Sequence, residues 1–124
     1  MDPYQTQRYA DASDDHDAYT LDEKVARSMG FPTLLVHGMC TFAFAARALV
    51  ECACGGAPRR LRRLAVRLSR PVFLYPDQCI DTRIWRLPPD RDRDRAAMAS
   101  FVYQSRDRDD AVVLTNGLAE VVTS

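Results

Sequence analysis

The apolar segment at residues 39–53, MCTFAFAARALVECA, constrains the fold more than any other part of this chain. A helix that is apolar on most sides is stable only when neighbouring structure covers it. Alanine dominates the segment, so another element packs close to its backbone. The apolar run is interrupted by Arg47 and is too short to span a bilayer. We therefore expect a buried helix. One face carries Met39, Phe42, Ala43, Ala46 and Val50, and the apolar residues Phe44, Ala45, Ala48 and Leu49 cover much of the rest.

After Pro58 the apolar pattern changes to a period of two. Alternation over residues 64–69, 80–85, 98–103 and 111–122 is typical of antiparallel strands. Residues 88–95 and 106–110 read as a charged hairpin loop and a tight turn. With 124 residues, of which 47% are apolar, the chain has the size of one domain. We expect a single α+β domain over residues 1–124, in which an antiparallel sheet of about four strands wraps the buried helix.

The region before the buried helix shows two shorter helical patterns. Residues 4–12 predict a helix with Tyr9 facing inward. In residues 20–30, Thr20 followed by Glu23 fits a capping box, and Gly30 is placed to end the helix. Between them lies DDHDAYT at residues 14–20, where acids and an imidazole are adjacent. This loop is either a proton-transfer site, an altered one, or simply the cap of the next helix.

Charge is balanced overall but unevenly placed along the chain. The formal net charge is zero, which argues against nucleic acid as a partner. Residues 1–23 hold seven acids against one arginine, whereas residues 57–70 hold six arginines and no acid. These arginines either meet the phosphates of a substrate carrier or keep a solvated strand edge from aggregating. The polar N-terminus is unlike a signal peptide, and the four cysteines lack paired spacing, so we expect a cytoplasmic protein with reduced thiols.

Two stretches together resemble the MaoC-like family of (R)-specific enoyl-CoA hydratases and 3-hydroxyacyl dehydratases, which have the hot-dog fold. Residues 9–51, YADASDDHDAYTLDEKVARSMGFPTLLVHGMCTFAFAARALVE, are similar to the hydratase motif, the His-Gly turn and the central helix of that family. Residues 61–78, LRRLAVRLSRPVFLYPDQ, are similar to the strand and turn that follow. Family members usually carry a first strand before these motifs, and the six residues at 1–6 are too short for it. The resemblance thus implies a four-stranded sheet, or one that borrows a strand.

The hydratase motif is altered in this chain. The family pattern is roughly Ser-Gly-Asp-x-Asn-Pro-Ile/Leu-His, and it aligns with residues 13–20. Asp15 then falls on the catalytic aspartate, but Thr20 occupies the position of the catalytic histidine. The second motif is intact, with His37 and Gly38 in their expected places. The resemblance implies that Asp15 acts as acid or base and that the Gly38 N–H donates to the thioester oxygen.

Each of the other candidate residues also has a purely structural explanation. His16, beside Asp15, is either a substitute base or a solvent-exposed histidine. Thr20 lacks an imidazole and has a good structural explanation as an N-cap. His37 is either a base or, more simply, a residue that stabilises the turn. A metal held by the acid cluster is poorly specified, and we expect neither a metal nor a cofactor. Thr20, His37 and Arg67 are therefore assigned to substrate binding.

Three functions remain open on this basis. The chain is a hydratase or dehydratase with altered acid–base machinery, or it catalyses isomerisation, elimination or cyclisation of a polyketide-like substrate with Asp15 alone. Alternatively, it is a non-catalytic subunit that pairs with an intact hydratase chain. The expected substrate is linked to coenzyme A or to an acyl carrier protein. We expect an obligate homodimer or a hot-dog heterodimer, because four strands of one chain cannot cover the central helix or close their own edges.

Overall fold

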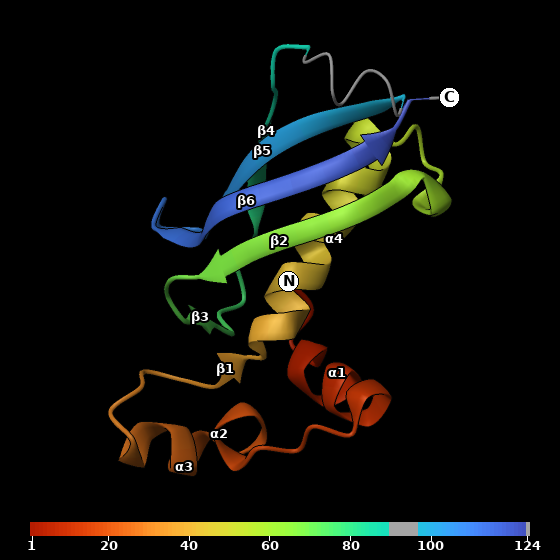
Figure 1. Ribbon diagram of the computed structural model, residues 1–124. Helices are drawn as coiled ribbons and strands as arrows, with labels where there is room; N and C mark the ends of the chain where they lie inside the picture. The colour runs from red at the N-terminus through yellow and green to blue at the C-terminus, as the bar shows by residue number, and fades with distance from the viewer. Residues whose placement is uncertain (90–96, 124) are drawn as a thin grey trace.

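The computed structural model describes residues 1–89 and 97–123 and confirms an α+β chain with the hot-dog fold (Figure 1). Helices come first and the main sheet follows. In chain order the elements are α1 (Gln5–Ser13), α2 (Ala18–Leu21), α3 (Glu23–Ser28), β1 (Leu35–Val36), α4 (Gly38–Ala53), a 3₁₀ turn (Pro58–Arg60), β2 (Leu61–Leu68), β3 (Val72–Phe73), β4 (Asp81–Arg86), β5 (Met98–Arg106) and β6 (Val112–Val122). The predicted loop at 88–95 lies largely outside the described residues.

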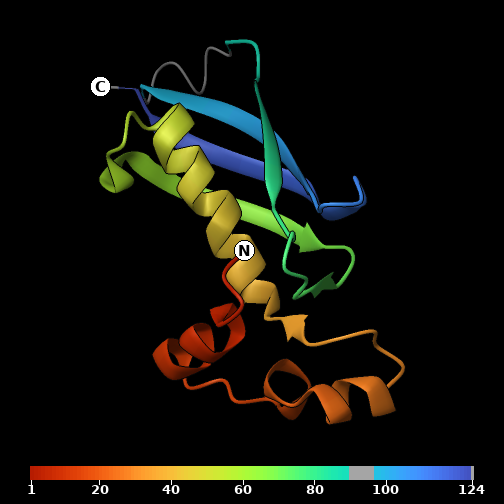
Figure 2. The same cartoon turned by 180° about the vertical axis from the view of Figure 1, so that it is seen from behind.

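The predicted four-stranded sheet is confirmed, with the antiparallel order β2-β6-β5-β4. It curves around one side of α4, as the two opposite views show (Figures 1 and 2). β1 and β3 form a separate two-stranded sheet at the end of α4 nearest α1. Side chains from α4, β1, β3, β5 and β6 make the core, whose buried members are Val36, Cys40, Ala45, Leu49, Val72, Tyr103, Val113, Leu114 and Ala119.

Within this single chain the sheet covers one side of α4 and leaves another side exposed, in line with the expectation that four strands of one chain cannot cover this helix. Ala45 and Leu49 are fully buried against the sheet, whereas Met39 is 58% exposed and Ala43 is exposed. A nearly uniform apolar sequence does not specify which side of a helix meets the sheet. No helix in the described part of the chain is long and apolar enough to cross a membrane.

The predicted capping role of Thr20 is also wrong. Asp22 is the N-cap of α3, and its carboxylate accepts a hydrogen bond from the Lys24 N–H at 2.9 Å. Thr20 instead lies within α2, a short helical turn that begins after Asp17. Aspartate caps a helix at least as well as threonine, so the helix starts two residues later than the capping-box pattern suggests. Gly30 adopts a left-handed φ of 89° after α3, as predicted.

One tyrosine spans the sheet across a glycine. Tyr103 on β5 pairs with Gly117 on β6, and a Cβ added at Gly117 would lie 2.6 Å from the Tyr103 ring. The ring therefore lies over the glycine. Its hydroxyl donates to the carbonyl oxygen of Ala65 on β2 at 2.8 Å. Burial raises the pKa of Tyr103 to about 12.

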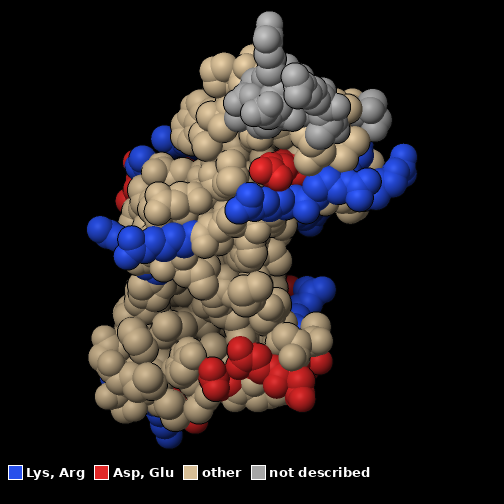
Figure 3. Space-filling model, in the orientation of Figure 1, with Lys and Arg blue, Asp and Glu red and all other residues tan. Residues whose placement is uncertain are grey.

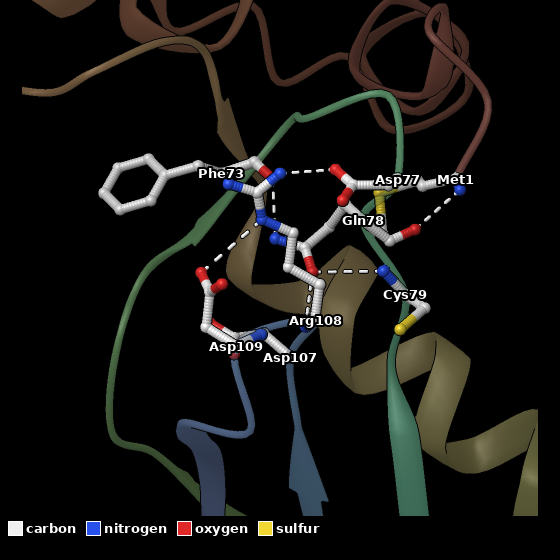
Figure 4. A network of polar contacts seen from close by, with 8 residues as sticks. All are labelled: Met1, Phe73, Asp77, Gln78, Cys79, Asp107, Arg108 and Asp109. Atoms are coloured by element: carbon white, nitrogen blue, oxygen red, sulfur yellow. Dashed lines mark hydrogen bonds and ion pairs between the residues drawn. The ribbon is translucent and has the colours of Figure 1, made fainter.

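The loop between β3 and β4 is joined to the β5–β6 turn by a polar network (Figure 4). The buried Gln78 side chain accepts from the Arg108 N–H at 3.0 Å and donates to the Phe73 carbonyl at 2.9 Å. The Arg108 guanidinium lies 3.7 Å from the centre of the Tyr75 ring and pairs with Asp77. A buried amide that is bonded through both its oxygen and its nitrogen in this way holds loops in one arrangement. The network thus fixes β3, which borders the pocket at the base of α4.

Candidate active site

A pocket of about 310 Å³ lies where the helical N-terminal region, the start of α4 and the ends of β2 and β3 meet. Four of the residues singled out in the sequence line it together: Asp15, Thr20, His37 and Gly38. They come from the loop after α1, from α2, and from the turn into α4. Leu35, Val72 and Leu114 add an apolar wall. Folding therefore gathers a carboxylate, a hydroxyl, an imidazole and a helix start around one pocket whose lining is part polar and part apolar.

The start of α4 presents a free backbone donor to this pocket. The His37 carbonyl accepts hydrogen bonds from the N–H groups of Cys40 and Thr41, at 2.9 and 3.1 Å. The Gly38 N–H belongs to the same planar peptide unit and points the opposite way, out of the helix. Among the described residues, none accepts a hydrogen bond from it. The helix dipole adds partial positive charge at this end, so the N–H suits an oxygen that gains negative charge.

A side chain at position 38 would collide with the pocket wall. A Cβ there would lie 2.9 Å from Leu68 Cδ1, closer than real contacts allow. Leu68 ends β2 and is 51% exposed, so its side chain can move. The absence of a side chain at Gly38 thus lets Leu68 cover the base of α4 while the N–H stays accessible.

One carboxylate oxygen of Asp15 accepts no hydrogen bond from any described residue. Its Oδ1 accepts from the Asp17 N–H at 3.3 Å, and its backbone carbonyl is bound by His37 Nε2 at 2.9 Å. The side chain is exposed and lines the pocket. The pKa of the Tyr9 hydroxyl is raised, first by burial and then by the charges of Cys40 and Asp15. The carboxylate is thus placed to exchange a proton with a molecule in the pocket.

Thr20 is held by its own hydroxyl. The residue is 1% exposed, and Oγ1 donates to the Asp17 carbonyl at 2.6 Å. Since the hydroxyl proton is engaged, its oxygen can only accept a hydrogen bond from a molecule in the pocket. A threonine hydroxyl does not ionise near neutral pH, so it cannot replace an imidazole as base.

The structure does not bring His16 or Arg67 to the pocket. The His16 ring faces the exposed acids around it, with Nδ1 3.4 Å from Asp14 and Nε2 3.7 Å from Asp11. Arg67 is exposed on β2, and Arg70, three residues further on, lines the pocket instead. No three metal-ligating side chains within residues 1–89 and 97–123 are grouped closely enough to hold an ion.

The charge asymmetry of the sequence persists on the surface. Acidic side chains gather at the end of the molecule formed by the helices α1–α3, and basic side chains cross the sheet above it (Figure 3). The pocket lies between these regions, because its lining includes Asp15 from the first and Arg70 from the second. Sequence reasoning missed Arg70, Leu68 and Tyr19 as lining residues. The arginine cluster pointed to the right region but not to the right member.

Comparison with known proteins gives consistent matches. The family profile described as MaoC like domain matches residues 1–103. A probable enoyl-CoA hydratase 2 from Dictyostelium discoideum is 30% identical over 112 residues, which is 90% of this chain and 34% of that protein. The 3-hydroxyacyl-thioester dehydratase Y of Mycobacterium tuberculosis is 38% identical over 93 residues, which is 75% of this chain and 30% of that protein. The chain thus spans about a third of the length of these relatives.

A solved structure agrees with the sequence matches. The MaoC-like dehydratase from Phytophthora capsici superimposes with a TM-score of 0.80 at 30% identity, over 100% of this chain and 38% of that one. Sequence profile, relatives and fold therefore point to one family, and all the residues that line the pocket except Leu114 come from the region that the family profile matches. The chain belongs to the MaoC-like domain family.

Proposed function

We propose that the chain acts as a hydratase- or dehydratase-type lyase on an acyl thioester, with Asp15 as its single acid–base group. The observation that carries this proposal is that one pocket holds both the Asp15 carboxylate, with an oxygen that no described residue hydrogen-bonds, and the Gly38 N–H, which has no acceptor among the described residues. The reaction needs these two functions: a group that moves a proton and a donor for the thioester oxygen as enolate charge develops. The names of the relatives, enoyl-CoA hydratase and 3-hydroxyacyl-thioester dehydratase, support the same chemistry.

One carboxylate suffices for a balanced dehydration. Asp15 removes the proton from the α carbon while the Gly38 N–H stabilises the enolate oxygen. The protonated Asp15 then gives this proton to the β hydroxyl, the bond from the β carbon to oxygen breaks, and water leaves. Hydration runs the same steps in reverse. Thr20 accepts a hydrogen bond from the β hydroxyl or from the water, because its own proton is engaged by Asp17. The loss of a histidine partner makes this slow, by about 10²–10⁴-fold.

The substrate is an acyl thioester carried by coenzyme A or by an acyl carrier protein. The apolar wall of Leu35, Val72 and Leu114 suits a hydrocarbon or polyketide-like chain. A lone carboxylate also serves elimination, isomerisation or cyclisation on such a chain. The four cysteines are free thiols, which supports a reducing compartment such as the cytoplasm.

The second candidate is a non-catalytic subunit that pairs with an intact hydratase chain. Two points favour it: the family pattern, laid on residues 13–20, puts Thr20 at the position of a catalytic histidine, and α4 leaves Met39 and Ala43 uncovered. A homodimer or a heterodimer with another hot-dog chain would cover that apolar side.

A spectrophotometric assay with crotonyl-CoA tests the catalytic proposal. Wild-type chain should hydrate it slowly, and Asp15→Asn should abolish the remaining rate while the protein stays folded by circular dichroism. Brisk wild-type turnover that survives Asp15→Asn would show that Asp15 is the wrong residue. No turnover of crotonyl-CoA or of 3-hydroxybutyryl-CoA would favour the subunit reading. Adding an intact hydratase chain and measuring complex formation would then test that reading directly.

A further inference from the structure

One hydrogen bond joins the two halves of the candidate site. His37 is 6% exposed, and Nε2 of its ring lies 2.9 Å from the backbone oxygen of Asp15. A carbonyl oxygen only accepts, so Nε2 must carry the hydrogen. This contact fixes the tautomer of the neutral ring and leaves a lone pair on Nδ1. Nδ1 is buried and has no partner among the described residues.

The loop that carries Asp15 has no other polar connection to the rest of the described structure. Hydrogen bonds at residues 14–17 otherwise stay within residues 10–20, as in the bonds from Asp14 N–H to Ala10 and from Asp15 N–H to Ser13. Even the contacts of His16 are with neighbouring acids. Within the described residues, the bond from His37 is therefore the single polar contact that sets the position of this loop relative to α4.

His37 is itself fixed on both sides. Its backbone caps α4, and its carbonyl shares a peptide unit with the Gly38 N–H. Its ring lies against the Tyr9 ring of α1, with centroids 4.8 Å apart and planes tilted by 48°. The imidazole is thus held by packing against α1 while its one engaged nitrogen holds the Asp15 loop.

We propose that His37 is a positioning residue that sets the distance between the Asp15 carboxylate and the Gly38 N–H. This rests on the proposed function, in which those two groups act on one substrate. The side chain of His37 acts through Asp15 and contacts no reacting atom. A shift of about 1 Å in a reacting group can cost on the order of 100-fold in rate, so a single tether of this kind has a measurable effect.

Two variants separate the hydrogen bond from the bulk of the ring. In His37→Gln the amide nitrogen can occupy the place of Nε2 and donate to Asp15. In His37→Leu the volume is largely kept and the donor is lost. We expect faster amide hydrogen exchange at residues 14–17 in His37→Leu, with protection restored in His37→Gln. In wild type, nitrogen-15 NMR should show hydrogen on Nε2 and none on Nδ1 of the neutral ring.

Kinetics supply the second readout. The kcat of His37→Leu for crotonyl-CoA should fall about 100-fold with little change in KM, and His37→Gln should recover most of it. In an Asp15→Asn background, which has no rate to compare, His37→Leu should still speed amide exchange at residues 14–17, because the His37 bond is to the backbone oxygen of residue 15. If His37→Leu does not fold, His37→Asn, whose shorter amide cannot reach Asp15, takes its place.

The proposal is overturned if the folded donor-free variant keeps wild-type protection at residues 14–17, or if His37→Gln is as impaired as His37→Leu. If the wild type proves inactive, the exchange and NMR results still decide whether His37 holds the Asp15 loop in place. An inactive chain with the expected exchange pattern would refute the proposed function, but it would still support the role of His37 in holding the Asp15 loop.

Discussion

Replacing Thr20 by histidine should restore the acid–base pair that the family pattern contains. Thr20 lines the pocket beside Asp15, so an imidazole at this position can project into the space of about 310 Å³. A positioned general base of this kind contributes about 10²–10⁴-fold in rate. This corresponds to about 3–5 kcal/mol of transition-state stabilisation. Thr20→His should therefore hydrate crotonyl-CoA at least about 100-fold faster than wild type.

The substitution has a structural cost that the geometry makes modest. It removes the hydrogen bond from Thr20 Oγ1 to the Asp17 carbonyl, which contributes about 1 kcal/mol. No helix cap is lost, because Asp22 caps α3. Since the larger side chain can enter the pocket, we expect less than the roughly 1–3 kcal/mol that overpacking costs in a closed core. Urea unfolding should show a loss of about 1–2 kcal/mol, which a domain of this size tolerates.

The assay compares wild type, Thr20→His, Asp15→Asn and the double variant by the loss of enoyl thioester absorbance. The double variant should fall back to the level of Asp15→Asn, because the imidazole needs the carboxylate as its partner. A gain in Thr20→His that survives Asp15→Asn would refute the pairing. A folded Thr20→His with no gain would refute the assignment of position 20, and would leave the altered-chemistry and subunit functions as the open alternatives.

Three further predictions follow from the fold and the site. Gly38→Pro should remove activity because proline lacks the N–H. Gly38→Ala needs only a shift of Leu68 and should weaken activity less. A folded proline variant with the wild-type rate would rule out this donor. The pKa of Tyr103 is raised from 10.0 to about 12 in the folded state. The contribution of Tyr103 to the free energy of unfolding is therefore complete below pH 10 and is lost as the pH rises towards 12. Urea unfolding across that range should show a fall of about 2–3 kcal/mol that Tyr103→Phe lacks. Sedimentation at micromolar concentration should show a dimer and no folded monomer, because the α4 side around Met39 is uncovered.

Much of the fold could be predicted from the chain because its strongest patterns are periodic. The change of period after Pro58 and the apolar segment at 39–53 predict one helix and four strands, and the sheet confirms them. The rotation of α4 could not be predicted, since nearly every side of it is apolar. Met39 and Leu49 look equivalent in the sequence, yet one is 58% exposed and the other is buried.

The candidate site, like the fold, could be predicted from the sequence only in part. The resemblance to the family brought Asp15, Thr20, His37 and Gly38 to attention, and the structure gathers all four around one pocket. The cap of α3 was misassigned because Thr20 and Asp22 both fit that position locally. The contact from His37 to the Asp15 carbonyl could not be foreseen. It joins residues 22 positions apart through a backbone oxygen, which leaves no trace in residue type.

The tyrosine that lies over Gly117 connects three neighbouring strands of the sheet. Its ring fills the space that a side chain at position 117 would need, and its hydroxyl bonds to Ala65 on the far strand. A side chain at 117 would also collide with the backbone oxygen of Tyr103, so a smaller residue at 103 would make only part of the room that it needs. In an alignment of homologous chains, we expect glycine at position 117 to be kept even where position 103 is not tyrosine. Gly117→Ala should therefore destabilise the chain even in a Tyr103→Ala background, as urea unfolding would show.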